Sequence, residues 1–186
     1  MTHTVLVIAA IGTSGSGKTT TLEYLISQLS TEGYKIGTIK HIHFANFTID
    51  KEGTNTWRHA KAGSKVVVAF SPDEVAVIRK KQIPTDQIGK IINFLKDDDL
   101  DIIFIEGLHD TMSKNQQIPK IITAKDETDL EQALKKAVAP VLAITGVVAT
   151  ITNKKIEQNI PLIKIPSEGD KLLKIVTSLL KSQQSE

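Results

Sequence analysis

The chain has 186 residues, of which 40% are hydrophobic and 24% charged, values that fit one soluble globular domain with a substantial core. Its formal net charge is only +2 and no long basic tract occurs, so nucleic acid is not an expected partner. The sequence has no cysteine, which excludes disulfides and thiolate metal sites and fits a reducing compartment. The apolar run at 5–11 is too short to span a bilayer and lacks a basic flank, so we expect no signal peptide, no membrane partner and a cytoplasmic location.

Strands and helices are expected to alternate from the N-terminus. The segment 5–11, VLVIAAI, is short, continuous and rich in β-branched residues, as in a buried parallel strand. A helix follows and stops near Gly33. Its apolar residues stand at helical spacing: Leu22, Leu25, Ile26 and Leu29. A second strand is predicted at 34–44 and a short helix ending at Gly63.

The middle of the chain carries a hairpin signal. Apolar runs at 64–70 and 74–80 flank Ser-Pro-Asp, which predicts two antiparallel strands. Thr85 is predicted to cap a helix whose apolar stripe is formed by Ile88, Ile91, Ile92 and Leu95. The segment 100–107, LDIIFIEG, reads as another buried strand.

The last third predicts three strands and two helices. Strands are expected at 119–124, 141–147 and 161–165. Thr128 and Glu131 match a capping box before a helix. The apolar residues of that helix are Leu130, Leu134 and Val138. Ser167 is predicted to cap the final helix, which carries Leu172, Ile175, Val176 and Leu179.

This alternation favours the α/β class. The expected architecture has three layers, with a mostly parallel sheet, helices on both faces and an inserted β-hairpin. We predict a single domain over residues 1–182, with the inserted hairpin at about 66–80 and a polar tail at 183–186.

The most specific motif lies in IGTSGSGKTTTLEYL, residues 11–25, where Gly12, Gly17, Lys18 and Thr19 fit G-x-x-x-x-G-K-[ST], the phosphate-binding loop or P-loop. Because the motif stands between the first strand and the first helix, we expect the α/β architecture to be a three-layer P-loop NTPase fold and the domain to bind a nucleotide. Glycines let the backbone wrap around phosphate oxygens, beside the positive end of the following helix. We expect Lys18 to reach the β- and γ-phosphates and the Thr19 hydroxyl to ligate Mg²⁺. The candidate nucleotide-binding residues are Gly12, Thr13, Ser14, Gly15, Ser16, Gly17, Lys18, Thr19 and Thr20, with Lys40 and His41 on the second strand.

Two carboxylates join Lys18 as candidate catalytic residues. Glu106 follows a buried apolar strand, at the edge where parallel sheets bind ligands, and is the expected second Mg²⁺ ligand beside Thr19. Asp50 lies in the loop after the second strand, where it could reach the γ-phosphate or a metal-bound water. A solvated strand-end residue is the alternative for Glu106, and an exposed loop residue the alternative for Asp50.

His41 and His43 are two apart on the predicted second strand and would share a face, which raises a metal site. Two imidazoles without a third ligand nearby are weak evidence, so polar strand-end residues near the phosphates are the preferred interpretation.

The ordered motifs resemble the molybdopterin-guanine dinucleotide biosynthesis protein B family over roughly residues 4–125. After the P-loop come GTIKHIHF at 37–44, IDKEGTNTWRHAKAG at 49–63, IFIEGL at 103–108 and the later PKI. The resemblance implies a GTP-binding protein with weak GTPase activity, acting beside a nucleotidyltransferase that attaches GMP to molybdopterin. It also implies a homodimer in which the hairpin forms part of the subunit contact.

The chain departs from the family pattern in places. Asn55 stands where the family often has Asp, and Leu108 with His109 where an aromatic and Lys are frequent. The stretch 141–150 lacks a frequent Asp. No N-K-x-D guanine motif is present, since Asn153 and Lys154 lack the acid that would complete it. The sequence therefore leaves the choice between GTP and ATP open.

Other P-loop classes are the alternatives. An ATP-dependent small-molecule kinase or ligase would use the same loop, but Arg58 and Arg79 are the chain's sole arginines and no Arg-rich lid occurs. A non-hydrolysing nucleotide-binding adaptor is a second alternative, and the measured rate of GTP turnover would distinguish it from a GTPase. Partition-type ATPases carry an extra early lysine, where this chain has Gly12-Thr13-Ser14.

Overall fold

The structure is a computed structural model and describes residues 5–152 and 159–183. The chain forms two compact units. The first, here called the sheet unit, comprises Met1–His41 and Ile88–Glu186, and the second, the hairpin unit, comprises Ile42–Gln87. In the described ranges no helix is long and apolar enough to cross a membrane.

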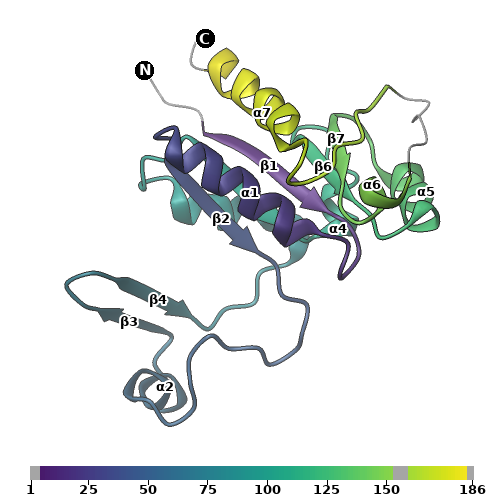
Figure 1. Ribbon diagram of the computed structural model, residues 1–186. Coiled ribbons are helices and arrows are strands. Elements are labelled where there is room, and N and C mark those ends of the chain that lie inside the picture. The colour runs from purple at the N-terminus through teal and green to yellow at the C-terminus, as the bar shows by residue number, and fades with distance from the viewer. Residues whose placement is uncertain (1–4, 153–158, 184–186) are drawn as a thin grey trace. The chain divides into compact units, whose positions relative to one another are not determined.

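The sheet unit is built on five parallel strands in the order β2-β5-β1-β6-β7 (Figure 1). The strands are β1 (Leu6–Ile11), β2 (Ile36–Lys40), β5 (Ile102–Glu106), β6 (Lys120–Thr123) and β7 (Val141–Thr145). β1 is central because its run VLVIAAI is apolar at every position, without alternating polar residues, and so buries side chains on both faces of the sheet. All the carboxyl ends of the strands therefore lie at one edge.

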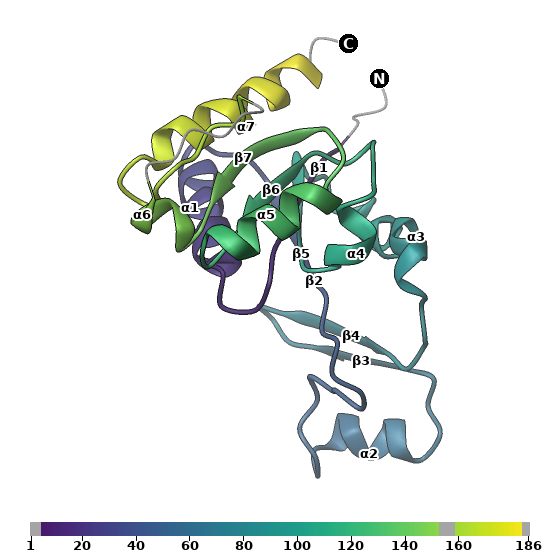
Figure 2. The same ribbon diagram turned by 90° about the vertical axis from the view of Figure 1, so that its right-hand side faces the viewer.

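Helices cover both faces of this sheet. Ile8 and Ala10 of β1 point to a core closed by α1 (Lys18–Thr31) and α7 (Gly169–Gln183). Ala9 and Ile11 point to the other face. That face packs against α3 (Ile88–Ile92), α4 (His109–Met112), α5 (Glu127–Lys136) and α6 (Val148–Ile151), as Figure 2 shows. The predicted three-layer α/β fold is confirmed.

Two predicted helix starts were wrong. Thr85 begins a 3₁₀ turn, η1 (Thr85–Gln87), and the segment continues as the short α3 and a second 3₁₀ turn, η2 (Asn93–Leu95). Gly89 and the β-branched isoleucines disfavour one continuous helix. The helix α5 is capped by Asp126, whose carboxylate accepts from the Asp129 amide at 2.8 Å, so Thr128 lies inside the helix.

Two C-terminal predictions also differ from the structure. The predicted strand 161–165 forms only a single parallel bridge, between Leu162 and Ile144. The run is short and lies at the sheet edge, so it has β7 alone to pair with. The last helix begins at Gly169 after a turn at 165–168, so Ser167 does not stand at its first position. Residues 184–186 of the predicted polar tail lie outside the described residues.

Lys120 is fully buried at the start of β6. Its Nζ donates to the carbonyl oxygens of Asn115 at 2.6 Å, Val138 at 2.9 Å and Pro140 at 3.5 Å. Burial lowers the pKa of the Lys120 ammonium, while these carbonyls satisfy its donors. The side chain thereby connects the segment that precedes β6 to the segment that follows α5.

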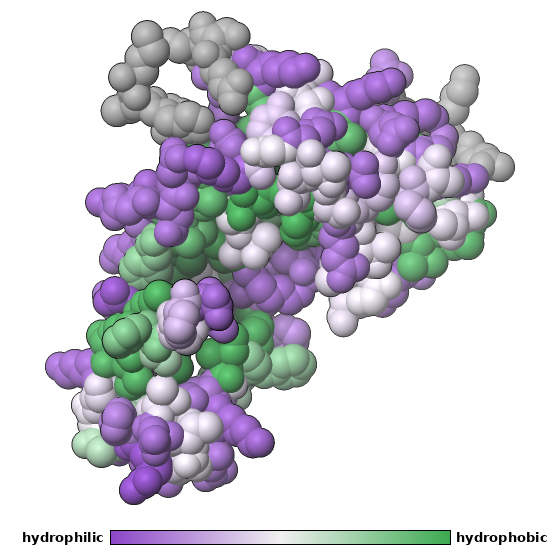
Figure 3. Space-filling model, turned by 60° about the vertical axis from the view of Figure 1, so that its left-hand side comes forward, coloured by the Kyte–Doolittle hydropathy of each residue, from purple (hydrophilic) through white to green (hydrophobic). Residues whose placement is uncertain are grey.

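The hairpin unit contains α2 (Asn55–Lys61), β3 (Val66–Phe70) and β4 (Val75–Arg79). The strands are antiparallel, with Val68 opposite Val77 and Phe70 opposite Val75, and Ser71 begins the predicted turn. One face of the hairpin consists of large exposed apolar side chains, which we call the valine face: Val66, Val68, Phe70, Val75 and Val77. Figure 3 shows apolar residues gathered on the surface of this unit.

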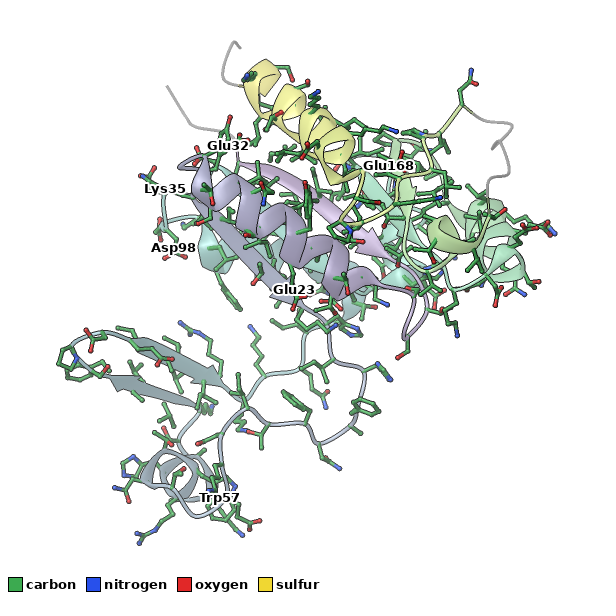
Figure 4. All side chains as sticks on the ribbon, viewed as in Figure 1. Glu23, Glu32, Lys35, Trp57, Asp98 and Glu168 are labelled. Atoms are coloured by element: carbon green, nitrogen blue, oxygen red, sulfur yellow. The ribbon has the colours of Figure 1, made fainter. Side chains whose placement is uncertain are left out.

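The helix α2 of the hairpin unit begins at a local cap. Thr54 accepts a hydrogen bond from the Trp57 amide at 3.3 Å. Trp57 projects from the helix, as Figure 4 shows, and the Lys61 ammonium lies 4.6 Å from the centre of its ring. The short helix predicted to end at Gly63 is therefore confirmed.

Candidate functional site

The loop between β1 and α1 places Lys18 at the first position of the helix. Its Nζ donates to the carbonyl oxygens of Gly12 at 2.9 Å and Thr13 at 2.6 Å, and so lies within the ring formed by the loop. Burial lowers the pKa of this ammonium, and the negative charge of Glu106 partly opposes that effect. A cation held at the mouth of a glycine-rich loop is positioned to neutralise phosphate oxygens.

Close packing under the loop explains Gly12. Its φ is +153°, and a Cβ there would lie 2.1 Å from the Thr123 carbonyl oxygen. Ser16 is fully buried and its hydroxyl lies 2.6 Å from Thr123 Oγ1 and 2.8 Å from the Thr13 carbonyl. The end of β6 therefore holds the loop from below, while Ser14, Gly15 and Thr20 are exposed above it.

A polar cluster joins α1, β2 and β5. Thr19 Oγ1 donates to Glu106 Oε1 at 3.0 Å, and the Lys40 ammonium forms an ion pair with the same oxygen. Lys40 and Glu106 are register partners at the carboxyl ends of adjacent parallel strands. The Glu106 side chain is 13% exposed, whereas that of Lys40 is 53% exposed. A threonine hydroxyl and a carboxylate are the oxygen ligands that Mg²⁺ prefers.

A second carboxylate reaches the loop from the opposite side. Asp129, in the first turn of α5, accepts from Thr13 Oγ1 at 2.7 Å and from the Lys125 amide at 3.0 Å. This contact links the P-loop to the segment that follows β6. Sequence reasoning missed Asp129, because the residues are 116 apart and nothing local marks the pair.

The turn after β7 also adjoins the loop. The Val147 amide donates to the Ser16 carbonyl at 3.2 Å, and a Cβ on Gly146 would lie 2.1 Å from that oxygen. Gly146 has φ of +94°, so this position combines left-handed backbone with a close approach. The glycine after a buried strand was the one available signal for this contact.

The predicted histidine pair does not share a strand face. β2 ends at Lys40, so His41 and His43 follow it in the loop, and they fall in different units. The His41 amide donates to the Glu106 carbonyl at 3.0 Å, which continues the pairing of β2 with β5 by one residue. The partner strand β5 ends at Glu106, the register partner of Lys40, so β2 has no further strand residue to pair with beyond this point. His43 instead stacks near Phe44, with ring centres 4.3 Å apart.

Asp50 lies in the hairpin unit, before α2. Its Oδ1 accepts from Thr54 Oγ1 at 3.0 Å and Thr56 Oγ1 at 2.8 Å. Its Oδ2 is buried and has no hydrogen-bond partner within residues 5–152 and 159–183. Its catalytic role stays a prediction.

His109 opens α4, three residues after Glu106. Its Nδ1 is buried and unpartnered in the described chain, and burial lowers the pKa of the imidazole. Asn153 and Lys154, the incomplete guanine motif, lie outside the described residues. Within the described ranges no group of three or more His, Cys, Asp or Glu side chains is arranged to hold a metal ion.

Comparisons with known proteins identify similar chains. The profile of the family described as "Molybdopterin guanine dinucleotide synthesis protein B" (MobB) matches residues 7–148. A Haemophilus influenzae protein named molybdopterin-guanine dinucleotide biosynthesis adapter protein is 32% identical over 129 residues, covering 68% of this chain and 67% of its own. An Escherichia coli protein of the same name is 30% identical over 116 residues, covering 61% and 62%.

The fold has a close counterpart among solved structures. The crystal structure of Bacillus subtilis MobB superimposes with a TM-score of 0.70 at 22% identity, covering 91% of this chain and 97% of the other. At that identity the likeness concerns the fold.

Proposed function

The chain belongs to the MobB family, and from that premise we propose that it binds GTP with Mg²⁺ and assists the synthesis of molybdopterin guanine dinucleotide. Family membership was the expectation drawn from the ordered motifs, and it is confirmed. The relatives named above are adapter proteins of that synthesis. We accordingly propose that this chain acts beside a guanylyltransferase-type partner, with weak GTPase activity of its own.

The observation that carries the nucleotide proposal is the geometry of Lys18. Its ammonium lies inside the ring of loop carbonyls, at the positive end of α1. When a triphosphate binds, Lys18 exchanges these neutral acceptors for charged phosphate oxygens, which make stronger hydrogen bonds. The loop glycines leave backbone amides free of side chains on the phosphate side.

The metal proposal depends on the Thr19–Glu106 contact. Both oxygens suit Mg²⁺, and the buried position of Glu106 at the end of β5 holds its carboxylate in one place. A bound Mg²⁺ would supply positive charge that neutralises the β- and γ-phosphates. Lys40 would then be released from Glu106 and become available to an anionic oxygen of the nucleotide.

We also propose a homodimer formed through the hairpin. An isolated two-stranded hairpin is marginal in water, and the valine face is uncovered in the single chain. Copies related by a two-fold axis would bring the same face together in a self-complementary contact.

Calorimetric titration with Mg·GTP tests the nucleotide proposal directly. Lys18→Ala should weaken binding by about 100-fold, since the charge-assisted hydrogen bonds to two phosphates are lost. Circular dichroism and the melting temperature should stay those of the parent. Equal affinity of parent and folded variant would refute the P-loop assignment. Turnover measured with and without a guanylyltransferase distinguishes a weak GTPase from a non-hydrolysing adaptor.

A further inference from the structure

Four buried hydroxyls connect the P-loop and the start of α1 to the ends of two strands. The Ser16 hydroxyl lies 2.6 Å from the Thr123 hydroxyl, and the Thr21 hydroxyl lies 2.9 Å from that of Thr145. All four side chains are fully buried. Thr123 and Thr145 are the last residues of β6 and β7, and they are register partners. Two similar pairs therefore lie next to each other, one under the loop and one under the helix.

Thr123 contacts the loop at three successive points. Its Oγ1 lies 3.2 Å from the Ile11 carbonyl oxygen, as well as 2.6 Å from Ser16 Oγ. A Cβ on Gly12 would lie 2.1 Å from the Thr123 carbonyl oxygen and 2.4 Å from its hydroxyl oxygen. The end of β6 is thus packed against the loop backbone, and its hydroxyl points at the loop.

The distances assign the hydroxyl protons. Ser16 has one hydroxyl proton and donates it to the Thr13 carbonyl at 2.8 Å, so its oxygen can accept from Thr123. The 2.6 Å separation of the two hydroxyls is that of a short O–H···O bond, whereas the Ile11 carbonyl is 3.2 Å away. A chain of hydrogen bonds therefore runs from Thr123 through Ser16 to the Thr13 carbonyl. Buried bonds in such a chain strengthen one another.

The end of this chain is shared with Lys18. The Lys18 ammonium donates to the same Thr13 carbonyl oxygen at 2.6 Å. When a triphosphate draws the ammonium onto its own oxygens, Ser16 remains as the side-chain donor to that carbonyl. The nucleotide-bound loop then depends on the hydroxyl chain more than the free loop does. A contact of this kind contributes to affinity by holding the site in its binding shape.

The second hydroxyl pair has no such connection to the loop carbonyls. Thr21 lies within α1, where its amide donates to the Gly17 carbonyl at 3.0 Å. The helix therefore fixes the Thr21 backbone by itself. The Thr145 hydroxyl stabilises the packing of α1 on β7 and leaves the loop unchanged.

We infer that Thr123 is a positioning residue for the nucleotide: acting through Ser16, its hydroxyl holds the P-loop in the shape that receives the phosphates. This inference rests on the proposed binding of GTP at the P-loop. It adds to that site a residue 107 positions away from Ser16 in the sequence, which touches no part of the nucleotide itself.

The test is calorimetric titration of the full chain with Mg·GTP, below the unfolding transition of every variant. Thr123→Val keeps the shape of the side chain and removes the hydroxyl. It should weaken binding by about tenfold, because the chain loses its first donor. Thr123→Ser keeps the hydroxyl and loses a methyl group, so its affinity should stay within about threefold of the parent.

Thr145→Val is the matched control, since it makes the same substitution in the register partner. Both valine variants should lower the melting temperature by a few degrees, because each removes one buried hydrogen bond. The affinity of Thr145→Val for Mg·GTP should nevertheless stay within about twofold of the parent. An equal loss of affinity in both valine variants would show a merely structural role and overturn the inference.

Ser16→Ala tests the same bond from the loop side. It should weaken Mg·GTP at least as much as Thr123→Val, and adding Thr123→Val should cost no more than about a further twofold. Independent losses that multiply in the double variant would overturn the inference. If Thr123→Val does not fold, Ser16→Ala and Thr123→Ser decide the question, and parent affinity in Ser16→Ala overturns the inference.

The remaining outcomes separate the inference from the proposed function. A parent chain that does not bind Mg·GTP would overturn the proposed function itself. Parent affinity in folded Thr123→Val would overturn the inference and leave nucleotide binding standing. A loss in Thr123→Ser as large as that in Thr123→Val would assign the effect to the methyl group and also overturn the inference.

Discussion

The sheet unit and the hairpin unit use apolar residues in opposite ways. In the sheet unit they lie in two clusters, one on each face of a five-stranded sheet. In residues 42–87, all of which the structure describes, Val67 is the one buried apolar residue, while the valine face is exposed together with Phe44, Phe47 and Ile49. The comparison teaches that the sheet unit supplies its own core, whereas the hairpin unit leaves most of its large apolar side chains exposed, as a surface that a second subunit would cover in the proposed homodimer.

The largest expected effect comes from a comparison of two phenylalanines, one in each unit. Phe104 of β5 is fully buried, and Phe70 of β3 is 83% exposed. Phe104→Ala should lower the free energy of unfolding by about 3–5 kcal/mol, because it leaves a cavity in the core. Phe70→Ala should change it by less than about 0.5 kcal/mol in dilute solution. Urea denaturation measures both, and a large Phe70 effect that grows with protein concentration would show that a second subunit covers this residue.

Charges on the valine face test what covers the hairpin. Val68 and Val77 are opposite each other on its two strands, and each is about half exposed. Val68→Asp or Val77→Asp should weaken self-association by at least about 100-fold, because a charge would be buried in an apolar contact. Sedimentation velocity at micromolar concentration measures this.

Lys65→Glu is the control for the hairpin, since Lys65 is exposed and precedes β3. A parent chain that sediments as a monomer would contradict the proposed homodimer. A dimer that tolerates both aspartates would move the interface to another surface.

The metal proposal allows a finer comparison within the sheet unit. Glu106→Gln should raise the Mg²⁺ concentration needed for half-maximal GTP binding by about tenfold, because a charged ligand is replaced by a neutral amide. Glu32→Gln makes the same chemical change at the exposed C-cap of α1, at the other end of the helix from Thr19, and should leave that Mg²⁺ midpoint unchanged. Magnesium titrations that overlay for Glu106→Gln and the parent would reduce Glu106 to a strand-end partner of Lys40.

The smallest expected effect is a pH dependence that separates two histidines. Burial lowers the folded-state pKa of His109, so the unfolded chain takes up its proton first as the pH falls. The stability contributed by neutral His109 is therefore complete above the unfolded-state pKa and is lost as the pH falls through the folded-state pKa. The slope is at most about 1.4 kcal/mol for each pH unit.

The melting temperature, measured from roughly pH 5 to pH 7.5, tests this effect, because histidine titrates in that range. His109→Gln should flatten the profile. His59→Gln, on the exposed side of α2, is the matched control and should follow the parent. Identical profiles for all three proteins would exclude His109 as the group responsible.

Much of the sheet unit could be predicted because its signals are local. The apolar run of β1, the glycines of the P-loop and the helical spacing in α1 stand within one stretch of sequence. Their order decides the fold class. The placement of Glu106 at the end of β5 followed from the same pattern.

What could not be predicted depends on contacts between distant segments. The Thr13–Asp129 hydrogen bond and the packing of Gly146 against Ser16 require the strand order, which no local pattern contains. Residues 161–165 have strand-like composition, but strand length was decided by the partners available at the sheet edge. The prediction that His41 and His43 share a strand face was wrong because it extended the second strand to residue 44, whereas β2 ends at Lys40.

The buried ammonium of Lys120 gives this protein an internal chemical reporter. Acylating reagents modify exposed lysines rapidly. They reach Lys120 Nζ only when its hydrogen bonds to the carbonyls of Asn115, Val138 and Pro140 break. Its rate of labelling, read by mass spectrometry, therefore measures how often the start of β6 opens. At the other end of β6, Thr123 forms a hydrogen bond with Ser16 of the phosphate loop. The same labelling rate therefore also reports how rigid the strand beneath that loop is.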